Sequence, residues 1–255
     1  MKNPEQVIYI KKIGDLRFWN KKFKRIYFGN EFCPNLIPTP KEVKIALAFA
    51  TKQNLEFSLL TCQVNDYFLK KFIKIFPILR EGDEIILNDW GILNVIKKRF
   101  KNLLPYCLLG KFITNNINLT IIDSRKFLKE RGFSGGSLKR LEMEIGALVD
   151  QRLLNPAKTK RVFHDFKVSV YYPYSFFSVT RLCPTAYCDK AVKPKNYRSE
   201  FRCQKECQKY TFLAKHPTKN IDLILKGNTW FKKASLPYFF KKNADRLVYM
   251  PTIPV

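Results

Sequence analysis

The chain has 255 residues, of which 46% are apolar and 15% aromatic, so it can bury the core of one large domain or two small ones. It carries 47 Lys and Arg against 21 Asp and Glu, a net charge of +26. This excess excludes an acidic protein and is compatible with a polyanionic partner such as RNA, DNA or an anionic membrane face. Because the basic clusters are short and occur throughout the chain, we favour the other explanation, a compositional bias spread over solvated faces.

We expect neither a targeting segment nor a linker. Residues 1–6 lack the apolar core of a secretory signal, and no run of roughly 18 apolar residues predicts a transmembrane helix. With ten glycines and no Ser/Gly-rich or Pro-rich tract, a flexible linker is not expected. The sequence therefore predicts one domain over residues 1–255, in a cytoplasmic protein whose cysteines are not paired in disulfides.

The first half of the chain alternates between short apolar strands and amphipathic helices, which predicts parallel strands joined by crossover helices. The pattern alone leaves a doubly wound sheet and a (β/α) barrel open. The expected elements are a strand at Val7–Ile10, a short helix or turn at Asp15–Phe23, a strand at Arg25–Gly29, a helix at Lys41–Gln53, a strand at Leu55–Cys62, a helix at Asp66–Phe76, a strand at Glu84–Leu87, a helix at Ile92–Leu104 and a strand at Tyr106–Leu109.

In either fold, ligands bind at the carboxyl ends of the strands. Four polar or thiol residues lie at those ends, namely Cys33, Cys62, Asn88 and Asp89. Asp89 is the best single carboxylate for a polar role in an active site. The alternative for Asp89 is an N-cap of the helix that follows it.

The second half of the chain is less regular. We expect a strand at Ile117–Ile122, a helix at Leu138–Asp150, a long β segment at Phe166–Val179, a strand at Ile221–Leu225 and a loop with short elements over Lys226–Val255. The two histidines, His164 and His216, lie in no His-Glu-x-x-His motif, and no Gly-x-Ser-x-Gly elbow is present. These absences argue against a zinc peptidase or a serine hydrolase.

Clustered cysteines are the strongest chemical signal. Four of the seven fall between Cys183 and Cys207, spaced Cys-x4-Cys-x14-Cys-x3-Cys. Thiolates are soft ligands that suit zinc, copper(I) or iron–sulfur clusters. The spacing fits a zinc knuckle poorly, because structural zinc sites use paired short spacings, whereas four thiolates from scattered loops can hold a larger iron–sulfur cluster. Cys62 and Cys107 are better explained as buried apolar residues.

Three segments carry a resemblance to a known family. Tyr27–Cys33, which contains Tyr-x-Gly-x-x-x-Cys, together with Asn88–Gly91 and the pair Cys203-x3-Cys207, resembles the collagenase-like peptidase family, peptidase family U32. Within that family the likeness is greatest to the UbiV-type subunits of oxygen-independent ubiquinone hydroxylation. The resemblance implies an α/β fold, a (β/α) TIM-barrel-like single domain with a cysteine-bearing loop region at 183–207.

The resemblance also implies a cofactor and a partner. It assigns a 4Fe-4S cluster to Cys33, Cys183, Cys203 and Cys207, with Cys188 as the alternative to Cys183. It implies a subunit of an oxygen-independent hydroxylase, paired with a second family member as a heterodimer and acting on a quinone precursor. Hydroxylation of a tRNA or rRNA base is the second hypothesis, which the net charge favours, and a peptidase is the third.

Overall fold

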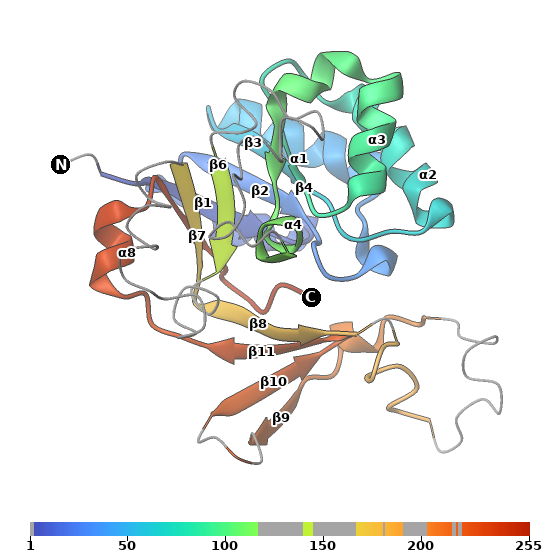
Figure 1. The fold of residues 1–255 in the computed structure, drawn as a ribbon, viewed down its shortest axis with the longest axis vertical. Coiled ribbons are helices and arrows are strands. Elements are labelled where there is room, and N and C mark those ends of the chain that lie inside the picture. The colour runs from blue at the N-terminus through green and yellow to red at the C-terminus, as the bar shows by residue number, and fades with distance from the viewer. Residues whose placement is uncertain are drawn as a thin grey trace.

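The computed structural model of the protein describes residues 3–116, 140–144, 167–180, 182–190, 203–215, 218 and 221–255. Its centre is a parallel sheet that curls into a closed ring (Figure 1), in the order β1-β12-β7-β6-β5-β4-β3-β2. The strands of the ring are β1 (Glu5–Ile10), β2 (Arg25–Gly29), β3 (Glu56–Leu60), β4 (Glu84–Leu87), β5 (Cys107–Leu109), β6 (Arg140–Glu144), β7 (Lys167–Tyr172) and β12 (Arg246–Tyr249).

The α/β class and a barrel-like parallel sheet are therefore confirmed, but the regular alternation of a full (β/α) barrel is not kept. The crossover from β1 to β2 contains the 3-10 helix η1 (Ile13–Phe18) in place of an α-helix. β5 and β6 share a single paired position, Leu109 with Leu141. Between β7 and β12 the chain builds a second sheet before it returns to the ring.

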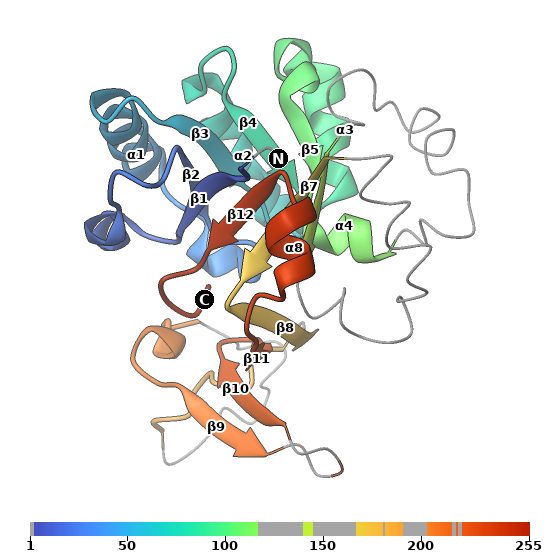
Figure 2. The same cartoon turned by 90° about the vertical axis from the view of Figure 1, so that its left-hand side faces the viewer.

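Helices cover the outer side of the ring along β2 to β5 (Figures 1 and 2). They are α1 (Pro40–Lys52), α2 (Asp66–Ile75), α3 (Trp90–Arg99) and the short α4 (Lys111–Asn116). Local sequence explains where they begin: Thr39 and Glu42 form a capping box at α1, and the side chain of Asn65 caps α2. The apolar faces of these helices pack on the outward side chains of the strands to form the main core.

Inside the ring, polar side chains lie at the amino end and aromatic side chains lie above them. Arg246 donates to both oxygens of Glu84, at 2.7 and 2.9 Å, and to Glu5 at 2.6 Å. The next layer towards the carboxyl ends contains Tyr27 and Tyr171, which are fully buried. The charges at the amino end are thus paired, as buried charges must be.

The second sheet lies against the carboxyl ends of the ring strands (Figures 1 and 2). Its order is β8 (Tyr174–Val179), β11 (Thr229–Lys233), β10 (Asp222–Lys226) and β9 (Phe212–Lys215), all antiparallel. Phe32, which follows β2, packs edge-to-face on Phe176 and Phe231 of the second sheet. The centroids of the aromatic side chains are 5.9 and 5.1 Å apart. This apolar contact fixes the sheet over the mouth of the ring. That residues 1–255 form one domain stays a prediction.

Two expectations for the second half are wrong in part, for non-local reasons. Of the helix expected at Leu138–Asp150, Arg140–Glu144 is strand β6, because it pairs along its whole length with β7. The long β segment at Phe166–Val179 is two strands in different sheets, divided at Pro173. The strand expected at Ile117–Ile122 lies outside the described residues.

The C-terminal region contains the short elements expected of it. The loop with short elements predicted over Lys226–Val255 holds β11, helix α8 (Tyr238–Asn243) and β12. β12 pairs in parallel with both β1 and β7 and so completes the ring. In the part of the chain that the structure describes, no helix is long and apolar enough to cross a bilayer.

Candidate metal centre

Cys33 lies at the carboxyl end of β2, on a turn that the preceding residues shape. Gly29 ends the strand with φ +127°, and a Cβ there would come within 2.9 Å of the carbonyl oxygen of Leu60, so glycine is required. The Oδ1 of Asn30 then accepts hydrogen bonds from the backbone nitrogens of Phe32 (3.0 Å) and Cys33 (2.8 Å). This Asx-type turn places the Cys33 thiol beneath the second sheet with 7% of its surface exposed.

The other three predicted ligands lie on two segments that a buried carboxylate connects. Cys183 begins a tight turn, in which its carbonyl accepts from the backbone nitrogen of Ala186 at 3.0 Å. Cys207 lies in the 3-10 turn Glu206–Gln208. The Oε1 of Glu206 accepts from the backbone nitrogen of Tyr187 at 2.9 Å, and Glu206 is only 5% exposed. This hydrogen bond therefore links the two cysteine segments.

The four predicted ligand thiols lie within electrostatic range of one another. Burial, with smaller contributions from the thiols of Cys203, Cys207 and Cys183, raises the pKa of Cys33 to about 12, against a hydrogen bond from the backbone of Asn35. Burial also raises the pKa values of Cys203 and Cys207, and Cys183 contributes to both. None of the seven cysteines forms a disulfide, and the assignment of Cys33, Cys183, Cys203 and Cys207 as one ligand set stays a prediction.

Cys188 and the remaining thiols stand apart from this group. Cys188 is exposed, and burial, Asp189, Glu206 and Cys183 raise its pKa. Cys62 is fully buried in the main core, and Cys33 is among the groups that raise its pKa. Cys107 is fully buried in β5. The choice of Cys183 over Cys188 as a ligand stays a prediction.

The four predicted ligands are all thiols, the donor type that zinc, copper(I) and iron–sulfur clusters take. Among the described residues, no group of three or more His, Cys, Asp or Glu side chains is close enough together to hold a metal ion. A structural zinc ion needs its four ligands in one tight tetrahedron. A four-iron cluster is larger and takes four thiolates from separate segments, which is the chemistry of the donors present here.

The hairpin turn between β10 and β11 contacts all three segments that carry the four predicted ligands. Gly227 has φ +62°, and a Cβ there would lie 3.4 Å from the Cβ of Cys207. The Nδ2 of Asn228 donates to the carbonyl oxygens of Phe32 (2.9 Å) and Thr180 (3.2 Å). Sequence reasoning missed this turn, although Gly-Asn between two apolar strands is a hairpin signal that could have identified it.

Two lysines place positive charge beside Cys207. Burial lowers the pKa of Lys11 to about 8, and Asp15 and Cys207 favour its charged form. Burial likewise lowers the pKa of Lys226, with Cys207 opposing the shift. Lys11 Nζ also donates to the carbonyl oxygen of Ile253 at 2.6 Å. Such cations would offset the charge of thiolates at this site.

Asp89 has a structural role as a hydrogen-bond acceptor for backbone nitrogens. Its Oδ1 accepts from the backbone nitrogens of Gly91 (2.7 Å) and Ile92 (3.1 Å), and its Oδ2 from that of Val64 (3.2 Å). This is the N-cap alternative for α3. The neighbouring Asn88 is the residue whose side chain is buried at the mouth of the ring, 1% exposed. His164 and His216 lie outside the described residues.

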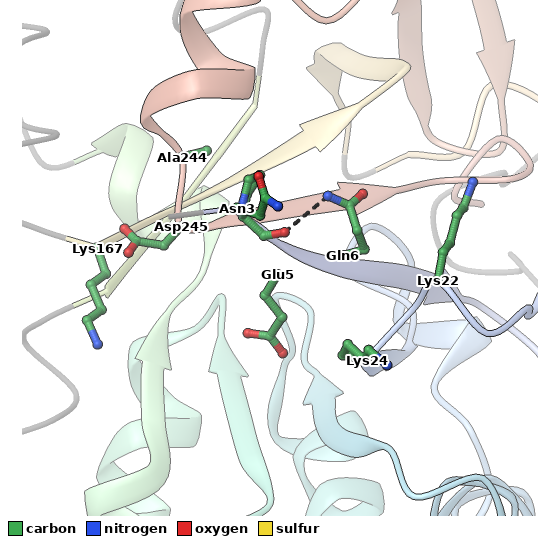
Figure 3. A pocket seen from close by; sticks show the side chains of 9 residues that line it. Asn3, Glu5, Gln6, Lys22, Lys24, Lys167, Ala244 and Asp245 are labelled. Atoms are coloured by element: carbon green, nitrogen blue, oxygen red, sulfur yellow. Dashed lines mark hydrogen bonds between the residues drawn. The ribbon is translucent and has the colours of Figure 1, made fainter. Parts of the chain in front are cut away.

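A polar cavity of about 540 Å³ lies at the opposite, amino end of the ring (Figure 3). It is lined by Asn3, Pro4, Glu5, Gln6, Lys22, Lys24, Lys167, Ala244 and Asp245. The three lysine side chains point away from one another and not towards a shared centre (Figure 3). The amino face of a barrel contributes to stability, whereas its ligands bind at the carboxyl face, so this cavity is not the candidate site.

Comparison with known proteins does not assign this chain to a family. No family model matches the chain, and no curated protein matches it either. Among solved structures, the chain is similar to the U32 peptidase Mk0906, with a TM-score of 0.49 and 11% identical residues, over 100% of this chain and 96% of that one. A likeness at this level carries no argument about activity or site residues.

Proposed function

We propose that this chain is an iron–sulfur protein in which Cys33, Cys183, Cys203 and Cys207 hold a 4Fe-4S cluster. The observation that supports this most is that four thiols from three segments, Cys33 after ring strand β2 and the other three beside the second sheet, are linked by their contributions to the raised pKa values of Cys33, Cys203 and Cys207. Barrel proteins bind their ligands at the carboxyl ends of the strands, where Cys33 lies. Cys62 and Cys107 belong to the core, and Cys188 is exposed.

Several residues would control such a site. A bound cluster would supply electron transfer at a potential set by charge, hydrogen bonds to sulfur and exposure. Gln208 Nε2 lies 3.6 Å from the sulfur of Cys207 and can donate to it. Lys226 and Lys11 provide the nearby positive charge. The second sheet excludes water from the Cys33 side through Phe32 and Phe231.

At a finer level, we propose that the chain is a subunit of an oxygen-independent hydroxylase of the peptidase family U32 type. The motifs Tyr27–Cys33 and Cys203-x3-Cys207 support this reading. It assigns a quinone precursor as the substrate, a second family member as the partner in a heterodimer, and a cytoplasmic location. The peptidase reading is weaker, because the described residues supply a thiol site and no assigned nucleophile–base pair.

RNA modification is the second candidate, and the charge of the chain favours it. The net charge is +26, and the last turn of α3 exposes Lys97, Lys98 and Arg99. Binding that neutralises phosphates weakens steeply with salt. Retention of tRNA or rRNA at moderate salt, with a steep salt dependence, would favour this candidate over the quinone precursor.

Anaerobic purification followed by iron and sulfide analysis tests the cofactor. We expect a brown protein with about four iron and four sulfide per chain, as four-thiolate ligation requires. Cys33→Ala should lose the cluster, whereas the neighbouring Cys62→Ala, a matched core substitution, should keep the iron content. A colourless protein with one zinc per chain would refute the proposal.

A further inference from the structure

Asn88 is a buried amide whose side chain joins three segments at the mouth of the ring. Its Nδ2 donates to the carbonyl oxygen of Thr61 (2.8 Å) and to the Oε1 of Glu31 (3.0 Å). Its Oδ1 accepts from the backbone nitrogen of Phe112 at 3.0 Å. These bonds use both amide donors and the amide oxygen. A Cβ at position 110 would come within 2.3 Å of that oxygen, so Gly110 is required for the close approach.

Glu31 is the link from this network to the cysteine site. Its side chain is fully buried, with one oxygen bound by Asn88 and the other 2.9 Å from the ammonium of Lys111, which is also fully buried. The Lys111 ammonium lies 4.8 Å from the ring centroid of Phe32 and 4.1 Å from that of Tyr171. Because an unpaired buried charge is costly, this arrangement holds Glu31 in one place.

Glu31 stands inside the turn that presents Cys33. The turn begins at Asn30, whose side chain binds the backbone nitrogens of Phe32 and Cys33. Residue 31 therefore cannot shift without moving the backbone that carries the thiol. We propose that Asn88 is a positioning residue for Cys33, acting through Glu31. This inference rests on the proposed function only in treating Cys33 as a cluster ligand.

The first test compares thiol reactivity in Asn88→Ala and wild-type protein. The full chain is purified anaerobically, treated with a chelator and exposed to iodoacetamide, and each cysteine is followed by mass spectrometry. We expect Cys33 to react about tenfold faster in the variant, since buried hydrogen bonds that hold its turn are lost. Cys107, fully buried in β5, serves as the internal reference and should keep its rate.

Asn65→Asp is the matched control variant, because Asn65 caps α2 through its Oδ1, an acceptor that aspartate keeps, and it should leave both thiols at wild-type rates. Equal acceleration of Cys33 and Cys107 in Asn88→Ala would mean general destabilisation and would overturn the positioning role. A Cys33 rate that stays at the wild-type value would overturn it too.

Two double variants test the same link if Asn88→Ala fails to fold. Glu31→Gln/Lys111→Met and Glu31→Leu/Lys111→Met both remove the ion pair without leaving a buried charge. They differ only in the group that faces Asn88 Nδ2: the glutamine oxygen can accept its hydrogen bond, and leucine cannot. Cys33 should stay protected in the first and become reactive in the second, and equal reactivity would contradict the inference.

The iron-loaded chain separates this inference from the proposed function. Wild-type protein without iron would defeat the proposed cluster, while the alkylation result would still stand. If wild-type protein holds the cluster, Asn88→Ala should release iron to a chelator about tenfold faster, and Asn65→Asp should not. Release from Asn88→Ala at the wild-type rate, together with unchanged Cys33 alkylation, would defeat the positioning role alone.

Discussion

The Oε1 of Glu206 accepts a hydrogen bond from the backbone nitrogen of Tyr187 across 2.9 Å, and this contact joins the segment of Cys183 to the segment of Cys207. Tyr187 has φ +57°, a left-handed backbone that few L-residues adopt. A buried carboxylate therefore holds a turn that local preference does not favour. The three late cysteines form one unit because of this long-range bond, beyond what their spacing provides.

Glu206→Ala should loosen that unit. The backbone nitrogen of Tyr187 would lose its partner in a buried position, which costs about 1–3 kcal/mol. We expect a loss of this size in the free energy of unfolding of the metal-free chain, measured by urea denaturation, and a lower iron content after reconstitution. Glu206→Gln keeps an acceptor oxygen and should retain most of both. Equal losses in the two variants would show that the charge, and not the bond to Tyr187, matters.

Cys183→Ala and Cys188→Ala should differ in iron content. Cys183 contributes to the raised pKa values of Cys33, Cys203 and Cys207, and Cys188 is exposed. We expect Cys183→Ala to fall well below about four iron per chain and Cys188→Ala to match wild type. Iron and sulfide analysis of both anaerobically purified variants measures the difference, and the reverse ranking would assign Cys188 as the fourth ligand.

The sequence permitted the first half of the fold to be predicted because its signals are local. Strands such as β3 and helices such as α1 carry their own apolar periodicity and caps. β12 was not assigned as a strand because residues far away in the sequence determine it. Arg246 is buried in β12 only because Glu5 and Glu84 neutralise its charge. β6 was assigned as helix for a similar reason, since its pairing with β7 outweighs a helical spacing of apolar residues.

The residues of the candidate site also fall into two groups, those that the sequence singles out and those whose role depends on distant partners. Residue type and spacing singled out the late cysteines, whereas the choice of Cys33, Cys183, Cys203 and Cys207 as one set comes from the resemblance to peptidase family U32 and stays a prediction. Sequence placed Asn88 at a strand end without a role and did not select Asn228, because an amide acquires a role only from the partners that the fold brings to it. Asp89 was the carboxylate selected at the strand end, and the structure uses it as a helix cap.

Gly227→Ala should destabilise the hairpin that contacts Cys207. Alanine at φ +62° is strained by about 1–2 kcal/mol, and its Cβ would lie 2.7 Å from Cγ1 of the fully buried Val255. We expect a lower midpoint of thermal unfolding. Gly14→Ala is the matched control, since no atom lies within 4 Å of a Cβ at that position. A Gly227→Ala protein as stable as Gly14→Ala would contradict the tight packing of this turn.

Acid should destabilise the protein through Glu84. Burial opposes its ionisation, but hydrogen bonds from Arg246 and the charge of Arg25 outweigh burial, so its pKa lies below the ordinary value of 4.5. A carboxyl whose pKa is lowered by folding stabilises the folded state above its unfolded-state pKa, and that stability is lost as pH falls through the folded-state pKa. Wild-type unfolding free energy should therefore hold from pH 7 to about 4.5 and decline below it, by up to about 1.4 kcal/mol for each unit that the pKa is lowered.

Glu84→Gln separates this contribution from that of the other carboxylates. The variant should be less stable at pH 7 by about 3–5 kcal/mol, because Arg246 and Arg25 lose a buried partner. Its decline below pH 4.5 should be shallower than that of wild type, since one titrating group is gone, while Glu5, whose pKa is also lowered, still titrates. Urea denaturation at intervals between pH 7 and pH 3 measures both effects. Parallel curves for the two proteins would mean that Glu84 is not a source of the acid sensitivity.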